Sequence, residues 1–360
     1  MVDVKVSVIV VPRERFSETR RSLESIYRCT RMPFELVYVD GGSPAGVARY
    51  LREAARRRGF RLLRRERYLM PNEARNIGAE AASGRLLVFI DNDVVAWPGW
   101  LEALVACAEE TGAWAVGPVV CIGPPGDDLI HVTRGELHEV EEGGRRRIED
   151  AMIGINERLR DLRPSLARSP CDYVEFHCML ARREALERIG GFDEGMRTTR
   201  EHIDFCLAVR REGGSIYFEP DACVTHVPPW CGFALSDLPY FLLRWNDDWA
   251  RESIVHFQRK WGLPDEAQDR LIDWIVPHRR VVFERLLAPF RPRIVRERLG
   301  RPLVNGLAAT LEAGLLPITR RRGRTGAPSA EGGVRFTRPA GDATAMRPPS
   351  AKMETGPDSP

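Results

Sequence analysis

The most informative absences in this sequence are those of long apolar runs, of paired cysteines and of a strong excess of either charge. No stretch approaches the roughly 18 uninterrupted apolar residues that a membrane-spanning helix requires, and the apolar run near the N-terminus is too short for a secretory signal. The eight cysteines include no Cys-x-x-Cys pair, which argues against a zinc ribbon or a thiol redox motif. We therefore expect a cytoplasmic protein, and arginine clusters and aromatic residues leave peripheral contact with the cytosolic membrane face open.

The net charge of +3 is small for 360 residues, so the composition does not indicate wholesale nucleic-acid binding. The chain is long enough for one large domain or two modest ones, and no internal repeat is present. Its character changes twice. Helical patterns rich in aromatic residues follow Pro229, and Gly, Pro, Ser, Thr, Ala and Arg dominate beyond about residue 320. We predict an α/β domain over residues 1–230, a helical extension over 231–319 and a disordered tail over 320–360.

Short apolar patterns typical of buried strands alternate with helix patterns in the first part of the chain. The predicted strands cover residues 6–11, 34–39, 60–63, 86–90 and 113–118, and the helices follow Ser17 and Pro44 or run over 72–82 and 100–110. This alternation requires crossover connections, which predict a mostly parallel sheet with helices on both faces. Ligands of such sheets bind outside the carboxyl ends of the strands.

The alternating pattern is lost over residues 121–170, where Gly, Pro and charged residues predict an excursion or a flexible loop flanking the site. The pattern returns with strands at 173–180, 215–219 and 222–227 and with helices at 183–189 and 201–212. Further helices are expected over 235–262 and 266–287, the second broken near Pro277.

Residues 86–93 read Leu-Leu-Val-Phe-Ile-Asp-Asn-Asp, so two carboxylates follow a buried strand at the point where it leaves the sheet. Carboxylates at alternate positions, here Asp91 and Asp93, can act together on a divalent cation, the usual partner of a substrate diphosphate. The alternative is a turn that caps the next helix. Further polar residues are expected at the same edge of the sheet: Asp40, Asn72, Arg75 and Asn76. We therefore predict a pocket there.

A series of short motifs runs through the chain in a fixed order. These are residues 6–12 (VSVIVVP), 37–43 (VYVDGGS), 72–78 (NEARNIG) with 82–84 (ASG), 89–93 (FIDND), 190–194 (GGFDE), 201–207 (EHIDFCL) and 220–226 (PDACVTH). In this order the chain resembles glycosyltransferase family 2 proteins with the GT-A fold, over roughly residues 5–230. The resemblance implies a Rossmann-like, mostly parallel central sheet, and transfer of a sugar from a nucleotide-diphosphate donor to an acceptor hydroxyl with inversion at the anomeric carbon.

The resemblance also implies roles for individual residues. Asp40 would bind the nucleobase, Arg75 would lie near the diphosphate, Asp91 would contact the ribose or sugar, and Asp93 would hold Mn²⁺ or Mg²⁺. Pro12, Asn72 and Asn76 complete the expected donor-binding set. His226 would be a further metal ligand, and imidazole favours manganese over magnesium. The alternative for His226 is a histidine that merely ends an edge strand.

An inverting transfer needs a base that takes the acceptor proton. Glu201 and Asp204 lie one helical turn apart at a predicted helix start, and the family's common form there is Glu-Asp-x-Asp. His202 replaces the first aspartate, which leaves the base open among Glu201, His202 and Asp204. We favour Glu201, because a carboxylate near the metal does not require a neutral histidine. Helix capping is the alternative role for both carboxylates.

The opening strand departs from the family, because residues 12–15 read Pro-Arg-Glu-Arg where a Thr-Tyr-Asn-like segment is common. We expect Arg13 and Arg15 to face solvent rather than phosphate. The same segment lacks the Gly-rich, Lys-containing loop of a nucleotidyltransferase, which disfavours that alternative. A degenerate sugar-nucleotide-binding or scaffold protein is the non-enzymatic alternative. The acceptor, whether a glycan, a lipid-linked precursor or a small molecule, is expected at residues 121–170 and in the helices after Pro229.

Overall fold

The computed structural model describes residues 5–264, 278–279, 282, 310 and 314. The helix expected over 266–287 falls almost entirely outside this range, and the tail expected over 320–360 lies wholly outside it. The predicted alternation of strands and helices is confirmed in the first part of the chain.

The first half of the central sheet is parallel and has the order β4-β1-β2-β3. Its strands are β1 (Val6–Val11), β2 (Glu35–Gly41), β3 (Arg61–Arg65) and β4 (Leu86–Asp91), and the helices α1 (Thr19–Cys29), α2 (Ala45–Arg58) and α3 (Pro71–Ala81) connect them. The register pairs Val11 with Asp91. The carboxyl ends of β1 and β4 are therefore level, so the residues that follow them meet at one edge.

The second half of the sheet is mixed, because β11 (Cys178–Arg182) runs antiparallel to both β4 and β6 (Ala115–Ile122). β11 is entered from the long segment before it and not through a crossover helix, so no parallel direction is imposed. β12 (Ile216–His226) pairs with β6 in parallel, and short strands β5 (Val94–Ala96), β7 (Ile130–Val132) and β10 (Ser169–Pro170) complete this half. The two strands predicted at 215–219 and 222–227 are one strand with a register shift between Glu219 and Cys223.

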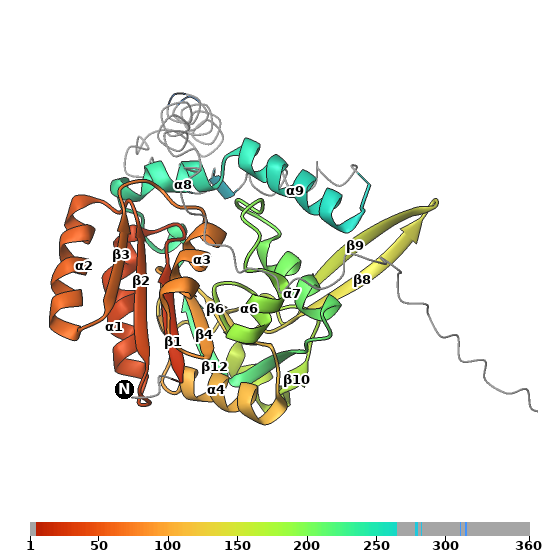
Figure 1. Ribbon diagram of the computed structural model, residues 1–360, viewed down its shortest axis with the longest axis horizontal. Coiled ribbons are helices and arrows are strands. Elements are labelled where there is room, and N and C mark those ends of the chain that lie inside the picture. Colours follow the sequence, from red (N-terminus) through yellow and green to blue (C-terminus); the bar gives the residue numbers. More distant parts are fainter. Residues whose placement is uncertain (1–4, 265–277, 280–281, 283–309, 311–313, 315–360) are drawn as a thin grey trace, which may run out of the picture.

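Of the two expectations for residues 121–170, an excursion or a flexible loop, the structure shows an excursion with regular secondary structure. It contains β7, α5 (Leu159–Leu162), β10 and a two-stranded hairpin of β8 (Gly135–Glu142) and β9 (Arg145–Met152), which projects from the body of the domain (Figure 1). Gly143 and Gly144 join the two strands and both have positive φ, at 60° and 75°, as a two-residue hairpin turn requires.

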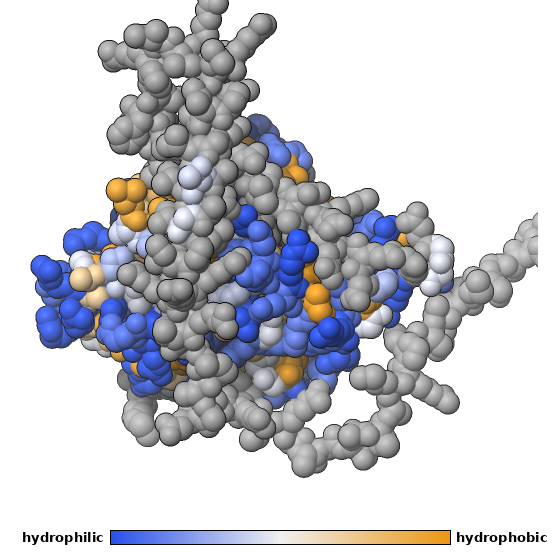
Figure 2. Space-filling view, turned by 90° about the horizontal axis from the view of Figure 1, so that it is seen from above, coloured by the Kyte–Doolittle hydropathy of each residue, from blue (hydrophilic) through white to orange (hydrophobic). Residues whose placement is uncertain are grey.

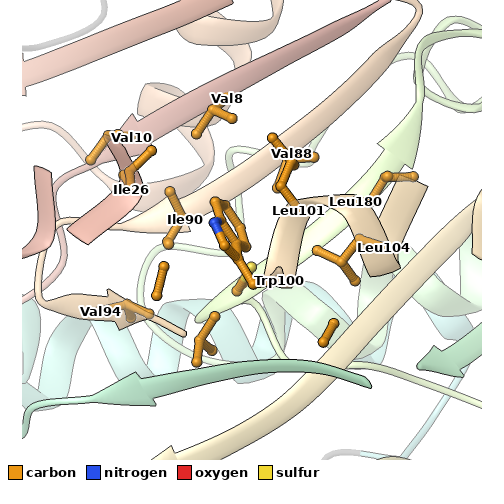
Figure 3. Packing of buried hydrophobic residues seen from close by; sticks show 14 of the residues in the cluster. Val8, Val10, Ile26, Val88, Ile90, Val94, Trp100, Leu101, Leu104 and Leu180 are labelled. Atoms are coloured by element: carbon orange, nitrogen blue, oxygen red, sulfur yellow. The ribbon is translucent and has the colours of Figure 1, made fainter. Parts of the chain in front are cut away.

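Apolar side chains on both faces of the sheet form the core. On one face, α1, α2 and α4 (Trp100–Thr111) cover one set of side chains, in which the fully buried Trp100 lies beside Ile90 (Figure 3). On the other face, α3, α6 (Arg183–Ile189) and α7 (Glu201–Arg211) pack on Ile9 and Phe89. The alternate residues of β1 divide between these two clusters, as a strand buried on both sides requires.

Two helices after the sheet, α8 (Leu238–Arg244) and α9 (Asp247–Trp261), lie along the edge where β1 to β4 end (Figure 1). The Tyr240 hydroxyl donates to the carbonyl of Leu69 at 2.7 Å, and the Ser17 hydroxyl donates to Asp237 at 2.5 Å. Figure 2 looks onto this edge, and its described surface is mainly hydrophilic with apolar residues in small separate patches. Among the described residues, no helix combines the length and apolarity needed to cross a bilayer.

The contact between α3 and β1 leaves no room for a methyl group at Gly78, because a Cβ there would lie 2.3 Å from Cγ2 of Ile9. We expect Gly78→Ala to lower the free energy of unfolding by about 1–3 kcal/mol, because the buried Ile9 side chain must shift. Urea denaturation measures this change. Gly46→Ala is the matched control in α2, since nothing lies within 4 Å of a Cβ at that position. The control should be neutral or stabilising, and equal losses in both variants would contradict the packing argument.

Candidate active site

The backbone of residues 91–93 is where three strands of the sheet meet. Asp91 N–H donates to the carbonyl of His177 before β11, Asn92 N–H donates to that of Val11 at the end of β1, and the Asp93 carbonyl accepts from Val227 after β12. The Asn92 side chain accepts from the Arg13 N–H at 2.9 Å. The next helix, α4, begins only at Trp100 with Gly99 as its N-cap. The alternative that residues 91–93 cap this helix is therefore wrong.

Asp91 is fully buried among three basic groups. Its Oδ1 lies 3.4 Å from Nη2 of Arg75, and its Oδ2 lies 3.4 Å from both Nη1 of Arg13 and Nδ1 of His177. Burial raises the pKa of Asp91 to about 6, although Arg13 and Arg75 oppose this shift. The two arginines converge on this carboxylate at the level where β1 and β4 end.

Asp93 and His226 face each other, with Nε2 of His226 3.9 Å from Oδ2 of Asp93. The pairing of His226 with Val94 across β12 and β5 places the imidazole there. In the part of the chain that the structure describes, Oδ1 of Asp93 and both ring nitrogens of His226 are buried and have no hydrogen-bond partner. Burial, and next the charges of Asp91 and Glu14, raise the pKa of Asp93 well above its usual range, while burial lowers the pKa of His226 and keeps the ring neutral.

These unpartnered atoms fit a divalent cation, because a carboxylate oxygen and a neutral imidazole nitrogen are ligands that Mn²⁺ accepts. The described residues contain no ready-made group of three or more His, Cys, Asp or Glu side chains around a metal position. Two side chains that could serve as ligands converge here, and the remaining positions of a bound cation would be left to substrate oxygens and water.

The expectation that Arg13 and Arg15 face solvent is wrong. The Arg13 side chain is 12% exposed and contacts Asp91 and Glu14. Arg15 is buried, and its guanidinium donates to the carbonyls of Val227 and Pro228 at 3.0 and 3.1 Å. Arg15 thereby ties the loop after β1 to the end of β12, while the positive charge of Arg13 lies beside two carboxylates.

Glu201 begins α7 and forms a buried ion pair with Arg244 of α8, at 2.8 Å between Oε1 and Nη2. Burial disfavours its charge, but Arg244, Arg75 and Arg13 outweigh that effect and lower the pKa of Glu201 to about 2. The residue before it, Arg200, has a positive φ of 67°. A left-handed conformation in a residue other than glycine costs on the order of 1–3 kcal/mol and is found mainly where function requires it.

Asp204 points to α9 and not to Asp93. Its Oδ2 accepts from Nζ of Lys260 and its Oδ1 from Nε1 of Trp261, each at 2.8 Å. Lys260 also donates to Asp193 at 2.8 Å. Asp204 therefore holds α9 against the start of α7.

His202 faces neither Arg244 nor Lys260. Its Nε2 lies 3.4 Å from Oε1 of Glu175. Its ring lies near the rings of Tyr173 and Phe176. The strand predicted over 173–180 begins only at Cys178, so residues 173–177 are an irregular segment that delivers Glu175 and His177 to the site.

The remaining predicted donor residues lie along the same edge. Asp40 accepts from the backbone N–H and hydroxyl of Ser43, each at 3.0 Å, and pairs with Arg64. Asn72 and Asn76 hold the turn after α6 through the carbonyls of Asp193 and Phe192. Pro12 is buried between β1 and Arg13.

Five residues of this cluster were not predicted as site residues: Arg13, Glu14, Glu175, His177 and Arg244. The first two follow directly after the opening strand, so their position at a strand end was a usable signal. Glu175 and His177 were hidden inside an apparent strand pattern. Arg244 carries no local signal, because its partner Glu201 is distant in the sequence.

The mixed sheet flanked by helices, with paired carboxylates at the carboxyl end of β4, has the architecture of the GT-A fold class. The solved structure of GalNAc-T7 with UDP, GalNAc and Mn²⁺ shares this fold with a TM-score of 0.50 and 18% identity, covering 76% of this chain and 54% of that one. Residues 7–190 match the family described as Glycosyl transferase family 2. The chain belongs to this family.

Two mycobacterial relatives are similar in sequence. The pre-mycofactocin glycosyltransferase of Mycobacterium tuberculosis is 29% identical over 156 residues, which are 43% of this chain and 30% of that protein. The N-acetylglucosaminyl-diphospho-decaprenol L-rhamnosyltransferase of the same organism is 27% identical over 251 residues, which are 63% of this chain and 76% of that protein. The matched region therefore spans less than a third of the first relative.

The ion pair between Arg244 and Glu201 yields a stability prediction. We expect Arg244→Met to lower the free energy of unfolding by about 3 kcal/mol, because Glu201 stays buried without its nearest cation. The double variant Arg244→Met with Glu201→Gln should lose less than the sum of the two single changes.

Urea denaturation of the four proteins in this cycle measures the coupling. Arg188→Met is the control, since the pair of Arg188 with Glu184 is exposed by 55% and 65% and should contribute less than about 1 kcal/mol. Strictly additive losses at positions 201 and 244 would show that the two side chains do not depend on each other.

Proposed function

We propose that the protein is an inverting glycosyltransferase that moves a sugar from a nucleotide-diphosphate donor to an acceptor hydroxyl with the help of a divalent cation. One observation carries this proposal: among the described residues, Oδ1 of Asp93 and both ring nitrogens of His226 are buried without a hydrogen-bond partner, and Nε2 of His226 lies 3.9 Å from Oδ2 of the same carboxylate. Burying such atoms without partners is costly, so their retention indicates a ligand. Asp93 and His226 would hold Mn²⁺ or Mg²⁺, with manganese favoured by the imidazole.

The bound cation would neutralise the charge that develops on the leaving diphosphate. The chain's own residues would act around it. Arg75, and with it Arg13, would lie near the diphosphate, Asp91 would accept from the ribose or sugar hydroxyls, and Asp40 would contact the nucleobase. The guanidinium groups of Arg13 and Arg75 are already fixed on Asp91 within 3.4 Å, so little reorganisation would accompany donor binding.

Inversion requires attack on the face of the sugar opposite the diphosphate, and a base for the acceptor proton. The start of α7 supplies the three candidates, Glu201, His202 and Asp204. The relatives support this class of reaction, because both carry the name of a glycosyltransferase. The acceptor would be a substrate of surface polysaccharide, glycolipid or natural-product glycosylation. The enzyme would act in the cytoplasm or at the cytosolic membrane face.

A nucleoside diphosphate should stabilise the protein only together with the cation. At about 100 times its dissociation constant, a ligand adds about 2.7 kcal/mol to the free energy of unfolding. We therefore expect a thermal-shift screen of nucleoside diphosphates to show one preferred base, and to show the shift in Mn²⁺ but not in EDTA. Asp93→Asn should remove the part of the thermal shift that depends on Mn²⁺.

Asp161→Asn is the control for this screen, since Asp161 lies 71% exposed on α5. The proposal fails if no nucleotide sugar in a panel is hydrolysed or transferred with Mn²⁺ and Asp93→Asn binds the diphosphates as the parent protein does.

A further inference from the structure

Two of the three candidate bases are already engaged by cations. The Glu201 and Asp204 side chains are each 4% exposed, and Arg244 and Lys260 respectively hold them at 2.8 Å. Glu201 is a weak base, because protonation would leave the buried Arg244 guanidinium unpaired. Both oxygens of Asp204 are occupied by Lys260 and Trp261. The His202 side chain is 19% exposed, so it is the most accessible of the three.

Glu175 is fixed so that one oxygen faces His202. Its Oε2 accepts from the Phe176 N–H at 3.2 Å, while Oε1 lies 3.4 Å from Nε2 of His202. The imidazole is held near the rings of Tyr173 and Phe176, with centroids at 5.5 and 6.3 Å. A carboxylate beside Nε2 favours the tautomer with its proton on Nε2, which leaves the Nδ1 lone pair free to accept a proton.

Phe176 joins this pair to the carboxylates at the end of β4. Its ring carries the Arg75 guanidinium at 4.4 Å, and Arg75 in turn lies 3.4 Å from Asp91. His177, the next residue, stacks on His226 with centroids 4.1 Å apart. The Phe176 side chain therefore lies between His202 and Arg75, one of the residues assigned to the donor.

We propose that His202 is the base for the acceptor hydroxyl and that Glu175 is its positioning residue. This inference rests on the proposed glycosyl transfer. The acceptor oxygen forms its bond to the anomeric carbon while the bond from that carbon to the diphosphate oxygen breaks, and the nucleoside diphosphate leaves with the electron pair. The hydroxyl proton passes to Nδ1 of His202, and the imidazolium, stabilised by the Glu175 carboxylate, then releases it to water.

The charges around the pair agree with this assignment. Burial disfavours the charge of Glu175, but His202, His131 and Arg13 outweigh it and lower the pKa of Glu175, so the carboxylate stays ionised. The titratable groups that face His202 are Glu175 and His177 from the segment before β11, His131 from β7 and Glu201 from its own helix. Among them, Glu175 alone is a carboxylate with an oxygen aimed at the imidazole and no cation of its own within 3.4 Å.

Steady-state kinetics of the full chain test this proposal, with the nucleotide sugar of the panel that the parent protein transfers as the donor. General base catalysis contributes about 10²- to 10⁴-fold, so His202→Gln should lower kcat by that factor with the donor KM unchanged. Glu175→Gln should lower kcat by less than His202→Gln does and move the acid limb of the kcat–pH profile to lower pH, and Glu175→Asp should recover part of the loss. Glu187→Gln, an exposed position on α6, should leave kcat unchanged.

Nucleoside diphosphate binding with Mn²⁺, measured by thermal shift, separates the possible failures. Variants that bind the nucleoside diphosphate as the parent protein does but transfer the sugar slowly support the roles proposed for His202 and Glu175. If His202→Gln keeps more than about a hundredth of kcat, or if Glu175→Gln leaves the pH profile unchanged, the proposed base or its positioning residue is wrong while the transferase assignment stands. If the parent protein binds no donor and transfers no sugar, both proposals fall together.

Discussion

The burial of several charges at the carboxyl end of β4 is the constraint on which the rest of the structure depends. Asp91, Asp93, Glu14 and Glu201 are all nearly inaccessible to solvent. Removing an ion from water costs several kcal/mol even after relaxation, so each carboxylate needs a cation or must bind a proton. Arg13 and Arg75 serve Asp91, and Arg244 serves Glu201. Among the described residues, no arginine or lysine forms an ion pair with Asp93, and burial, followed by the charges of Asp91 and Glu14, raises the pKa of its carboxyl.

The fold concentrates these charges by bringing strand ends and distant helices to one place. The register of β1 and β4 sets the loop that carries Arg13 beside Asp91, and the pairing of β12 with β5 brings His226 to Asp93. Helices α8 and α9 contribute Arg244 and Lys260 to carboxylates of α7. The helical extension predicted after residue 230 is thus joined to the α/β domain through one buried and one partly buried ion pair. A substitution in α8 or α9 that removes one of these cations should alter the position of the start of α7, which carries the proposed base.

Local patterns were sufficient for much of the fold. The apolar run before Asp91 and the polar residues after β2 identified the strand ends, because a buried strand leaves a clear mark in the sequence. The hairpin of β8 and β9 was missed although Gly143 and Gly144 mark its turn, since charged residues on both strands obscure the alternation. The bulge that makes one strand of residues 216–226 also has no simple signature, because Pro220 and Asp221 resemble a turn.

The partners in the site were less predictable because they depend on contacts between distant segments. Arg13 and Arg15 look like solvent-facing arginines until the positions of β4 and β12 are known. Glu201 looks like a free carboxylate until α8 places Arg244 beside it. His177 and Glu175 became visible only when β11 was found to begin at Cys178. In each case the sequence shows which residue is present, but the residue that pairs with it can be identified only from the fold.

The central claim is that Asp93 and His226 bind the divalent cation that accompanies a nucleoside diphosphate. The most direct measurement is pulsed electron paramagnetic resonance of Mn²⁺ added to the protein with the preferred diphosphate. The account predicts a directly coordinated imidazole nitrogen whose coupling disappears in His226→Leu and persists in His138→Leu, at an exposed position in the hairpin. An all-oxygen coordination shell, or a nitrogen signal that survives in His226→Leu, would contradict it.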